Sequence, residues 1–486
     1  MQMEKYIEKD LQNLETLATI RSENLVEYTL DAALKKVEDK KKGLEEMAEA
    51  AGKRSEYERV LLDFVPQYIY EVMEGQMVVT EYVEKTKSKQ MVYVFLGTHW
   101  QLADIQLYYM FVKRCAKRMG LDDQYCEDPD FMNKISERLA YRVMDYRKQV
   151  SMPDTVMVNL SNGTLEIKKD GTFVLREHRA ADFFTYVLPY VYSKNAKCPQ
   201  WHAFLDRVLP EKEMQTLLAE YIGYCFTQNL KLEKMAVFYG TGSNGKSVCL
   251  DIITRIMGSC NVSNVTLSAL TCDDEKRSLI EGKLANISHE SNGELDTAML
   301  KQIVSGEPTE VRVLYRGTHT MTEIPKLFTS YNRLPSTEST YGFFRRWILF
   351  PFKVTIPEEE QDVDLVGKLT KELPGILNWV LVALAGLLER KAFGKSDVCH
   401  NALSEYIKGS NSVLSFFSAK CEVDEASRTT LLDLYKAYTQ YCNEEEMKRF
   451  GKKNFQEIIR NFGAKSVMYN GYISYTVKIK EEEKNS

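Results

Sequence analysis

The stretch Gly240-Thr-Gly-Ser-Asn-Gly-Lys-Ser247 decides the fold of this chain, because it stands between an apolar run and a helical one. Met235 to Tyr239 precede it as a candidate strand, and Val248 to Met257 follow as a helix that Gly258 is placed to cap. Glycines let consecutive backbone N–H groups turn inward around phosphate oxygens, and the positive end of the next helix attracts the same anion. The stretch therefore predicts a nucleotide phosphate loop in an α/β sheet.

Within this loop we expect Lys246 to reach the β- and γ-phosphates of ATP and the Ser247 hydroxyl to ligate Mg²⁺. The predicted nucleotide-binding residues are Gly240, Thr241, Gly242, Ser243, Asn244, Gly245, Lys246 and Ser247. A chance glycine-rich turn is the alternative, and the complete motif between a strand and a helix argues against it. The loop alone does not distinguish a helicase from a kinase or a GTPase, so the rest of the site has to decide.

Three further positions complete a candidate ATPase site. Glu290 ends the apolar run that begins at Leu284, and a carboxylate there suits the general base that activates water. Asn332 follows the strand-like Lys326 to Ser330 and can sense the γ-phosphate, although an asparagine that only turns the chain has the same signature. Arg345 and Arg346 precede another apolar run, where one can act as an arginine finger or both can be surface residues.

Composition places this site in an ordinary globular chain of 486 residues, 44% hydrophobic and 27% charged. No stretch approaches the roughly 20 consecutive apolar residues of a membrane span, and the start lacks a signal peptide, so we expect a cytoplasmic protein without a membrane partner. The ten cysteines form no C-x-x-C pair, which suggests neither zinc nor disulfides, and most should be buried.

Patterning divides the chain into four predicted segments. A helical N-terminal segment covers 1–75, and a small α+β domain covers 76–230, where turns at Asn162-Gly163 and Asp170-Gly171 indicate a β-meander. The ATPase core covers 231–395. Residues 396–486 give two helix patterns and a hairpin at Asn470-Gly471, a winged-helix outline. The predicted class is a multidomain α/β protein.

Taken together, these motifs resemble the superfamily 3 helicases, in particular the helicase half of phage, plasmid and poxvirus primase-helicases. The order matches: Gly240 to Ser247 as Walker A, Ser288-His-Glu290 as Walker B, Leu300 to Pro308 between them and the sensor, Tyr331-Asn332 as the sensor, and Phe344-Arg-Arg346 as the arginine finger. Upstream, the stretches from Asn159, His178 and Cys198 resemble the domain that precedes the helicase in that family. The pattern departs at His289, where the family often has an acidic residue, so direct metal ligation by this motif is not expected.

The resemblance implies an AAA+ type ATPase that forms a homo-hexameric ring and moves along one DNA strand, usually 3′ to 5′. It also implies a hairpin projecting into the ring channel, which Val311 to Thr322 fits, with Arg316 and His319 at the tip. A cationic tip suits a phosphate backbone held without regard to sequence, although an ordinary surface hairpin fits the residues equally well. The family's primase half is missing, so a separate primase or host replication proteins are expected as partners.

The C-terminal end independently indicates a DNA partner. The chain carries a net charge of −5, yet from Met447 to Lys480 eight basic residues stand against the single acidic Glu457. In a winged helix, Lys452 to Asn461 would be the recognition helix, with Lys452, Lys453 and Arg460 as DNA contacts. A winged helix that contacts protein is the alternative.

The sequence thus predicts an ATP-dependent DNA helicase that unwinds single-stranded and forked DNA for the replication of a phage, plasmid or other mobile element. An ATP-switched replication initiator that binds origin DNA without processive unwinding is the second hypothesis. A third, an ATPase unrelated to DNA such as an antiviral sensor, requires the hairpin and the basic end to be incidental. Stimulation of ATP hydrolysis by DNA separates the third hypothesis from the other two.

Overall fold

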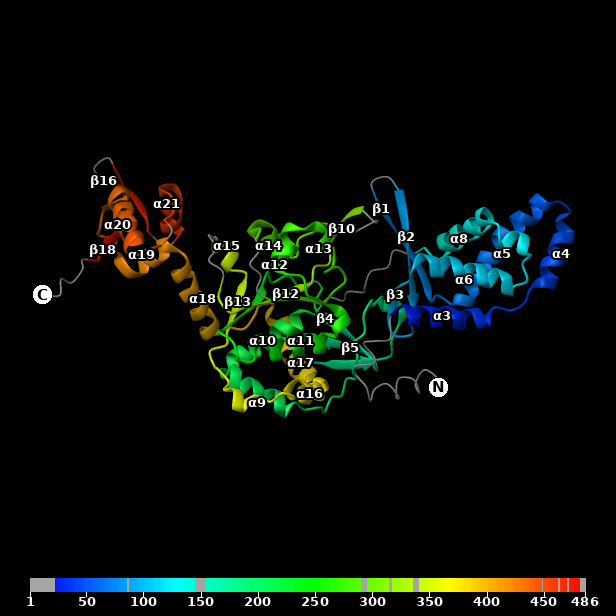
Figure 1. Cartoon of the computed structure of the whole chain (residues 1–486), viewed down its shortest axis with the longest axis horizontal. Helices are drawn as coiled ribbons and strands as arrows, with labels where there is room; N and C mark the ends of the chain where they lie inside the picture. Colours follow the sequence, from blue (N-terminus) through cyan, green and yellow to red (C-terminus); the bar gives the residue numbers. More distant parts are fainter. Residues whose placement is uncertain are drawn as a thin grey trace.

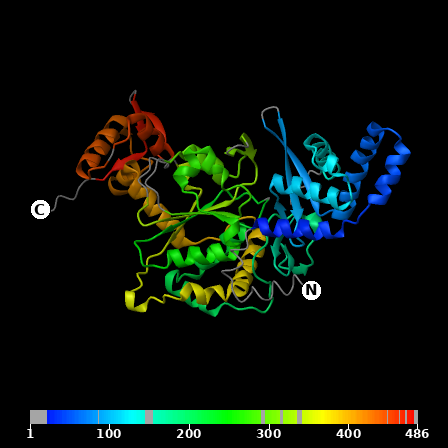
Figure 2. The same cartoon turned by 45° about the vertical axis from the view of Figure 1, so that its right-hand side comes forward.

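Three parts of the chain follow one another in space as they do in sequence. Figures 1 and 2 show an N-terminal domain at one end, an α/β core in the middle, and a C-terminal domain at the other end. The computed structural model describes residues 22–84, 87–144, 154–228, 230–289, 295–313, 317–334, 341–447, 449–461, 464–469 and 472–480.

Helices fill residues 22–73, as predicted for that part of the first segment: α3 (Ser22–Lys36), α4 (Lys41–Ala51) and α5 (Arg54–Met73). A three-stranded antiparallel sheet and more helices follow: β1 (Met77–Glu84), β2 (Lys87–Phe95), β3 (Trp100–Leu102), α6 (Ile105–Arg118), α7 (Asp123–Cys126) and α8 (Pro129–Arg142). One hydrophobic core contains Met73, Met77 and Val79, so packing crosses residue 75 without a break. The division into segments at 75, 230 and 395 stays a prediction.

The predicted β-meander is present as β4 (Thr155–Leu160), β5 (Gly163–Lys168) and β6 (Phe173–Arg176), paired in that order. Its first turn stands at Asn162-Gly163, because Leu160 pairs with Gly163. After a 3₁₀ turn at Ala180–Asp182, the chain continues into α9 (Pro199–Val208) and α10 (Lys212–Tyr224). The meander and these helices share a core with one face of the central sheet, so the meander is a supporting wall of the α/β core.

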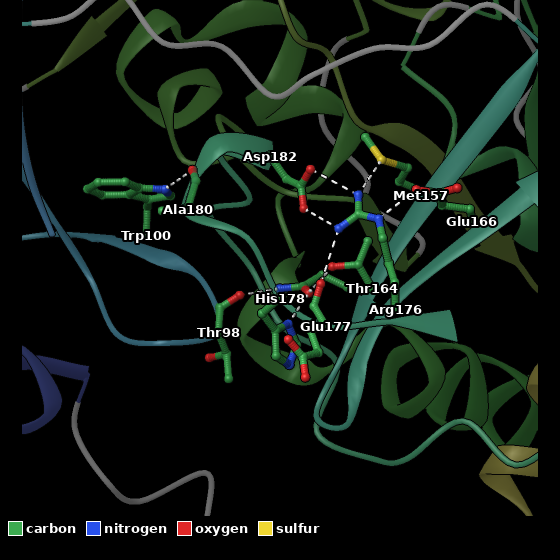
Figure 3. A network of polar contacts seen from close by, with 11 residues as sticks. Thr98, Trp100, Met157, Thr164, Glu166, Arg176, Glu177, His178, Ala180 and Asp182 are labelled. Atoms are coloured by element: carbon green, nitrogen blue, oxygen red, sulfur yellow. Dashed lines mark hydrogen bonds and ion pairs between the residues drawn. The ribbon is translucent and has the colours of Figure 1, made fainter. Parts of the chain in front are cut away.

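A buried ion pair fixes the end of the meander. Arg176 donates through both terminal nitrogens to the two carboxylate oxygens of Asp182, at 2.8 and 2.9 Å, and through Nε to Glu166 at 2.6 Å (Figure 3). The side chains of Arg176 and Asp182 are 12% and 7% exposed. A bidentate pair this well covered is expensive to break, because either partner alone would leave an uncompensated charge.

Asn159 joins this wall to the N-terminal domain. Its amide nitrogen donates to the carbonyl of Thr98, in the turn between β2 and β3, at 2.9 Å and to the carbonyl of Tyr186 at 2.8 Å. Its amide oxygen accepts from His178 Nδ1 at 2.9 Å. One buried side chain thus holds three segments together, which explains a polar residue inside a strand that is otherwise apolar.

His99, next to Thr98, makes this junction sensitive to acid. Burial, with a smaller contribution from nearby His178, lowers the pKa of His99 from 6.5 to about 4. The folded state therefore holds His99 neutral, whereas the unfolded chain takes up a proton below pH 6.5. Stability should be intact above pH 6.5 and should fall by about 3 kcal/mol as the pH drops from 6.5 to about 4.

Urea unfolding of the natural protein and the His99→Gln variant at pH 7.5 and pH 5 tests this prediction. The variant should lose less stability between the two pH values than the natural protein, because it lacks the group that titrates. Equal losses in both proteins would show that His99 does not titrate in this range.

The central sheet has five parallel strands in the order β13-β7-β12-β9-β8. They are β7 (Met235–Tyr239), β8 (Val262–Ser263), β9 (Ala285–His289), β12 (Lys326–Tyr331) and β13 (Trp347–Pro351). Alternate residues of β7 belong to opposite cores, Ala236 and Phe238 to one and Met235 and Val237 to the other. This alternation explains the uninterrupted apolar run, since both faces of the strand are buried.

Helices cover both faces of this sheet. On the face shared with the meander lie α9, α10, α11 (Lys246–Met257), α16 (Leu365–Thr370) and α17 (Leu373–Arg390). On the other face lie α12 (Leu267–Cys272), α14 (Thr297–Val304), α15 (Tyr341–Phe344) and α18 (Asp397–Ser410), with α13 (Asp274–Ser278) and the hairpin β10 (Thr309–Val313) and β11 (Gly317–Met321) beside them. The predicted α/β core is therefore a three-layer arrangement.

Two expectations from composition concern the cysteines, expected to be mostly buried, and membrane spans, of which none was expected. Eight of the ten cysteines are buried and all ten are free thiols, so the prediction that most are small core residues is confirmed. Among the described helices, α17 is long and apolar enough to cross a membrane, but it packs against α10 and contributes seven buried residues to the core of the sheet.

The C-terminal domain has its own core and contains the predicted helices and hairpin. Its elements are α19 (Ser412–Lys420), β14 (Cys421–Val423), β15 (Thr429–Thr430), α20 (Leu431–Glu444), α21 (Lys452–Asn461), β16 (Ser466–Tyr469), β17 (Tyr472–Tyr475) and β18 (Val477–Ile479). Helix α18 leads into it from the α/β core, where Tyr406 stacks on Trp347 with ring centroids 6.0 Å apart and planes within 9°.

Candidate nucleotide site

The phosphate loop joins β7 to α11, as the sequence predicted for residues 240–247. Gly245, with φ +84°, immediately precedes α11, and a Cβ there would lie 2.8 Å from Val208 Cγ1. A Cβ on Gly240 would collide with the Asn244 amide and the Phe352 carbonyl. Both positions therefore require glycine, one for its backbone angle and both for lack of space.

Lys246 points back into the loop that it follows. Its side chain is buried, and Nζ donates to the Gly240 carbonyl, to Asn244 Oδ1 at 3.2 Å and to Asn332 Oδ1 at 3.3 Å. Three oxygens hold the ammonium inside the loop, in the position where the phosphates of a nucleotide would need a counter-charge. Lys246 and Asn332, 86 residues apart, are thereby brought together as the sequence predicted.

Asn332 reaches the loop because β12 is the direct neighbour of β7. Tyr331 pairs with Tyr239, and the Gly240 backbone N–H donates to the Tyr331 carbonyl at 3.2 Å. The residue after Tyr331 therefore stands beside the first glycine of the loop. Along the chain, β8 and β9 of the same sheet come between these two strands, so the adjacency depends on the strand order of the sheet.

The strand that leads to Glu290 ends at the same edge of the sheet. In β9, His289 pairs with Ser330 of β12, and His289 Nδ1 lies 3.1 Å from Ser330 Oγ. Glu290 itself lies outside the described residues, so its role as general base stays a prediction. The carboxyl ends of β7, β12 and β9 form one edge, where an α/β sheet binds ligands.

A segment that sequence reasoning missed supports the loop from the other side. The Phe352 carbonyl accepts from the Asn244 amide at 3.3 Å, and the Ile356 backbone N–H donates to the Ser243 carbonyl at 2.7 Å. Phe352 follows β13, the neighbour of β7 on the side away from β12. No local motif marks these residues, because they act through backbone groups, and only the strand order would have found them.

Arg345 and Arg346 lie at the opposite edge of the sheet. They precede β13, which runs parallel to β7, and the Met235 backbone N–H at the start of β7 donates to the Arg346 carbonyl. The five residues of β7, at about 3.3 Å each, therefore separate them from the loop by about 16 Å. These arginines do not reach the nucleotide site of their own subunit.

The two arginines differ in their surroundings. Arg346 is 12% exposed, and its guanidinium donates to Ser305 Oγ at 2.8 and 3.1 Å and pairs with Glu233 at 3.3 Å. Arg345 is 55% exposed and lies 3.6 Å from the same carboxylate. Arg346 is thus held by contacts within this chain, whereas Arg345 is largely accessible to solvent.

The candidate channel hairpin is present as β10 and β11, but one tip residue was placed wrongly. His319 pairs with Val311 in the middle of the hairpin, and its Nε2 lies 2.9 Å from both carboxylate oxygens of Glu281. The register places His319 away from the turn, because Gly317 already pairs with Val313. Arg316 lies outside the described residues, so a DNA contact there stays a prediction.

The predicted DNA-binding residues of the C-terminal domain are accessible. Helix α21 has the bounds that the sequence predicted, Lys452–Asn461, and it buries Phe455 and Ile459 in the domain core. Lys452, Lys453 and Arg460 are exposed on it, and Glu457 is exposed among them. The helix presents a mainly cationic surface to solvent.

The loop suits a nucleoside triphosphate with Mg²⁺ by its donor set. Residues 240–247 supply an ammonium, three hydroxyls and the N-terminus of the 12-residue helix α11, and no carboxylate. Thr241, Ser243 and Ser247 are exposed, so their hydroxyls are accessible to a ligand. Such a set favours an anion, with Ser247 as the side chain that would contact its metal ion.

Comparisons with known proteins agree with the resemblance seen in the sequence. The family model described as D5 N terminal like matches residues 75–210, and a family of unknown function, DUF5906, matches residues 238–346. A protein of Acanthamoeba polyphaga mimivirus described as a "putative helicase" is 24% identical over 258 residues, which are 50% of this chain and 24% of that protein. The chain therefore spans about a quarter of that relative.

Solved structures of the C-terminal region of NrS-1 resemble the chain more weakly. The A-form apo structure of residues 305–718 gives a TM-score of 0.48 at 11% identity, covering 85% of this chain and 99% of that one. A second A-form apo structure gives 0.47 at 10% identity, covering 86% and 98%. Likeness at this level supports no conclusion about function. Residues 75–210 thus resemble the D5 N terminal like family, and half of the chain resembles part of a viral protein described as a putative helicase.

Proposed function

We propose that this chain is an ATP-dependent DNA helicase with an AAA+ type core, acting in the replication of a phage, plasmid or other mobile element. The observation that carries the proposal is the 3.3 Å contact between Lys246 Nζ and Asn332 Oδ1. It unites a phosphate loop and a polar strand end at one sheet edge, which is the arrangement that an enzyme needs to bind a nucleotide and detect its γ-phosphate.

In this proposal ATP lies in the loop, with Lys246 against its β- and γ-phosphates and Ser247 on Mg²⁺. Magnesium supplies neutralisation of the charge that develops on the transferred phosphoryl group. Glu290 orients and deprotonates the attacking water, and Asn332 exchanges its contact with Lys246 for one with the γ-phosphate or the water. Loss of the γ-phosphate then returns Asn332 to Lys246.

The position of the arginines supports an assembled ring. Since Arg345 lies about 16 Å from the loop of its own subunit, it can complete a site only in a neighbouring subunit. A head-to-tail arrangement of identical subunits that closes on itself satisfies this demand for every site. We propose a homo-hexamer in which Arg345 is the finger.

The DNA strand would pass through the channel of this ring, with movement from 3′ to 5′ and with Arg316 on the β10–β11 hairpin as a contact. The cationic surface of α21 would hold the duplex ahead of it by phosphate contacts. A separate primase or host replication proteins would supply the primers. We also propose a cytoplasmic location.

Strand displacement from a forked duplex with ATP and Mg²⁺ tests the proposal. A helicase should release the displaced strand with ATP and should release none with a non-hydrolysable analogue. ATP hydrolysis stimulated by DNA without displacement would instead favour an initiator that switches its assembly on origin DNA, for which the basic C-terminal domain is the supporting feature. ATP hydrolysis at the same rate with and without DNA would contradict both the helicase and the initiator.

A further inference from the structure

The end of the β16–β17 hairpin exposes large apolar side chains on both of its faces. Met468 and Ile473 form one cross-strand pair and are 71% and 42% exposed, and Tyr469 and Tyr472 form the next pair and are 51% and 68% exposed. Consecutive residues of a strand point to opposite faces, so one face carries the methionine and isoleucine and the other carries the tyrosines. We refer to these four residues as the apolar blade.

The blade extends from a hairpin whose other end is anchored. Ser474 and Tyr475 of the same strand are buried, and Tyr475 belongs to the core of the C-terminal domain together with Phe455 of α21. The exposed pairs are therefore held at a fixed distance from a rigid base.

Such exposure in an anchored hairpin points to a ligand. Isolated apolar residues on a surface are ordinary, whereas four large ones clustered at the end of a rigid element favour a binding site. The ligand has to present a flat apolar surface that can lie against one face of a two-stranded hairpin. It also has to suit a domain with exposed cations, which are Lys452, Lys453 and Arg460 of α21 and Lys478 of β18.

A nucleic acid with an uncovered base meets both requirements. Inside a continuous duplex every base face is covered by its neighbour, and the grooves present polar base edges. At a junction between duplex and single strand, the last base pair presents a flat apolar face, and the phosphates on either side carry the negative charge. Aromatic side chains stack on such faces regardless of sequence, and apolar wedges separate base steps.

We propose that the apolar blade binds the exposed base face at a junction between duplex and single-stranded DNA, while α21 holds the adjacent phosphates. This inference rests on the proposed function, which supplies DNA as the partner. It adds that the C-terminal domain selects one DNA structure, the junction between duplex and single strand. It assigns the tyrosine face to the last base pair, since stacking requires an aromatic plane. The C-terminal domain then recognises where strands part, in addition to any phosphate contact along the duplex.

The experiment compares affinities of the full chain for three DNAs of equal length in 0.15 M salt. They are a fork with 2-aminopurine at its last base pair, a single strand, and a duplex whose ends are closed by non-nucleotide loops. The double variant Tyr469→Ala, Tyr472→Ala should bind the fork about tenfold to a hundredfold more weakly and the closed duplex equally well. It should also fail to quench the 2-aminopurine.

Two further variants separate stacking from other causes. Tyr469→Phe with Tyr472→Phe keeps the aromatic planes and should bind the fork within about twofold of the natural protein. Leu432→Ala removes another exposed apolar residue of the same domain, 66% exposed on α20, and should change nothing. Equal thermal unfolding midpoints for all variants are expected, because none of these side chains is in the core.

Several outcomes would overturn the inference. Equal losses on the fork and the closed duplex would assign the tyrosines to general DNA binding, and losses on the single strand alone would assign them to unpaired bases. If the alanine variant and the natural protein differ in native mass in the absence of DNA, the blade contacts a second copy of the chain, paired along the edge strand β16. If the natural protein unwinds DNA while the alanine variant binds forks normally, the inference fails and the proposed function stands. If fork binding depends on the tyrosines but the natural protein does not unwind DNA, the inference stands and the proposed function fails.

Discussion

Replacing Lys246 by alanine should lower the rate of ATP hydrolysis about a hundredfold to a thousandfold and abolish strand displacement. The side chain is a buried, preorganised positive charge, and removing one such donor from a site where charge develops costs this much in rate. Steady-state hydrolysis with saturating DNA measures the effect. Since uncoupled residual hydrolysis would not move a strand, displacement should be lost completely.

Lys326 offers a matched control for this substitution. It is another lysine of the α/β core, with its ammonium 4.3 Å from the ring centroid of Tyr224, and burial lowers its pKa to about 8. It begins β12, at the opposite edge from the phosphate loop. Lys326→Met should therefore leave hydrolysis unchanged, and a loss comparable to that of Lys246→Ala would mean that the effect comes from the fold.

Replacing Arg345 by alanine should lower ATP hydrolysis about 10³-fold to 10⁵-fold while nucleotide binding stays unchanged. An arginine finger acts on the transition state and contributes little to the bound ground state. Because Arg345 is 55% exposed, its loss should not shift the thermal unfolding midpoint. Arg346→Ala should lower that midpoint, because it removes the partner of Ser305 and Glu233.

Mixing two inactive proteins tests whether Arg345 acts on a neighbour. In a mixed ring, a subunit with Arg345→Ala retains Lys246, and a subunit with Lys246→Ala retains Arg345, so some interfaces between them carry both intact residues. Mixtures should therefore hydrolyse ATP faster than either protein alone. If mixtures stay as inactive as their components, or if Arg345→Ala is fully active, the finger is a different residue.

The sequence predicted the parts of the site that depend on short-range patterns. The phosphate loop, the strand before Asn332 and helix α21 all stand where the residues indicated, because glycine spacing, apolar runs and amphipathic periodicity act over a few residues. The β-meander followed from its two glycine turns for the same reason.

What the sequence could not predict depends on contacts between distant strands. The support of the loop by Phe352 and Ile356 follows from the position of β13 beside β7, which no local signal encodes. His319 was misplaced because the register of a hairpin is set by how its two strands pair, and one residue of slip reverses the faces. Asn159 entered the prediction only as the start of a stretch that resembles the domain before the helicase, whereas its amide joins three segments.

The stacking of Tyr406 on Trp347 couples α18 to β13, the strand that follows Arg345 and Arg346. Helix α18 in turn leads into the C-terminal domain. Trp347 directly follows Arg346, so a tilt of β13 relative to its neighbours is passed to the helix at Tyr406. Tyr406 stands four residues before the end of α18, about 6 Å along the helix from the start of the C-terminal domain. A rearrangement at β13 would therefore act close to the C-terminal domain.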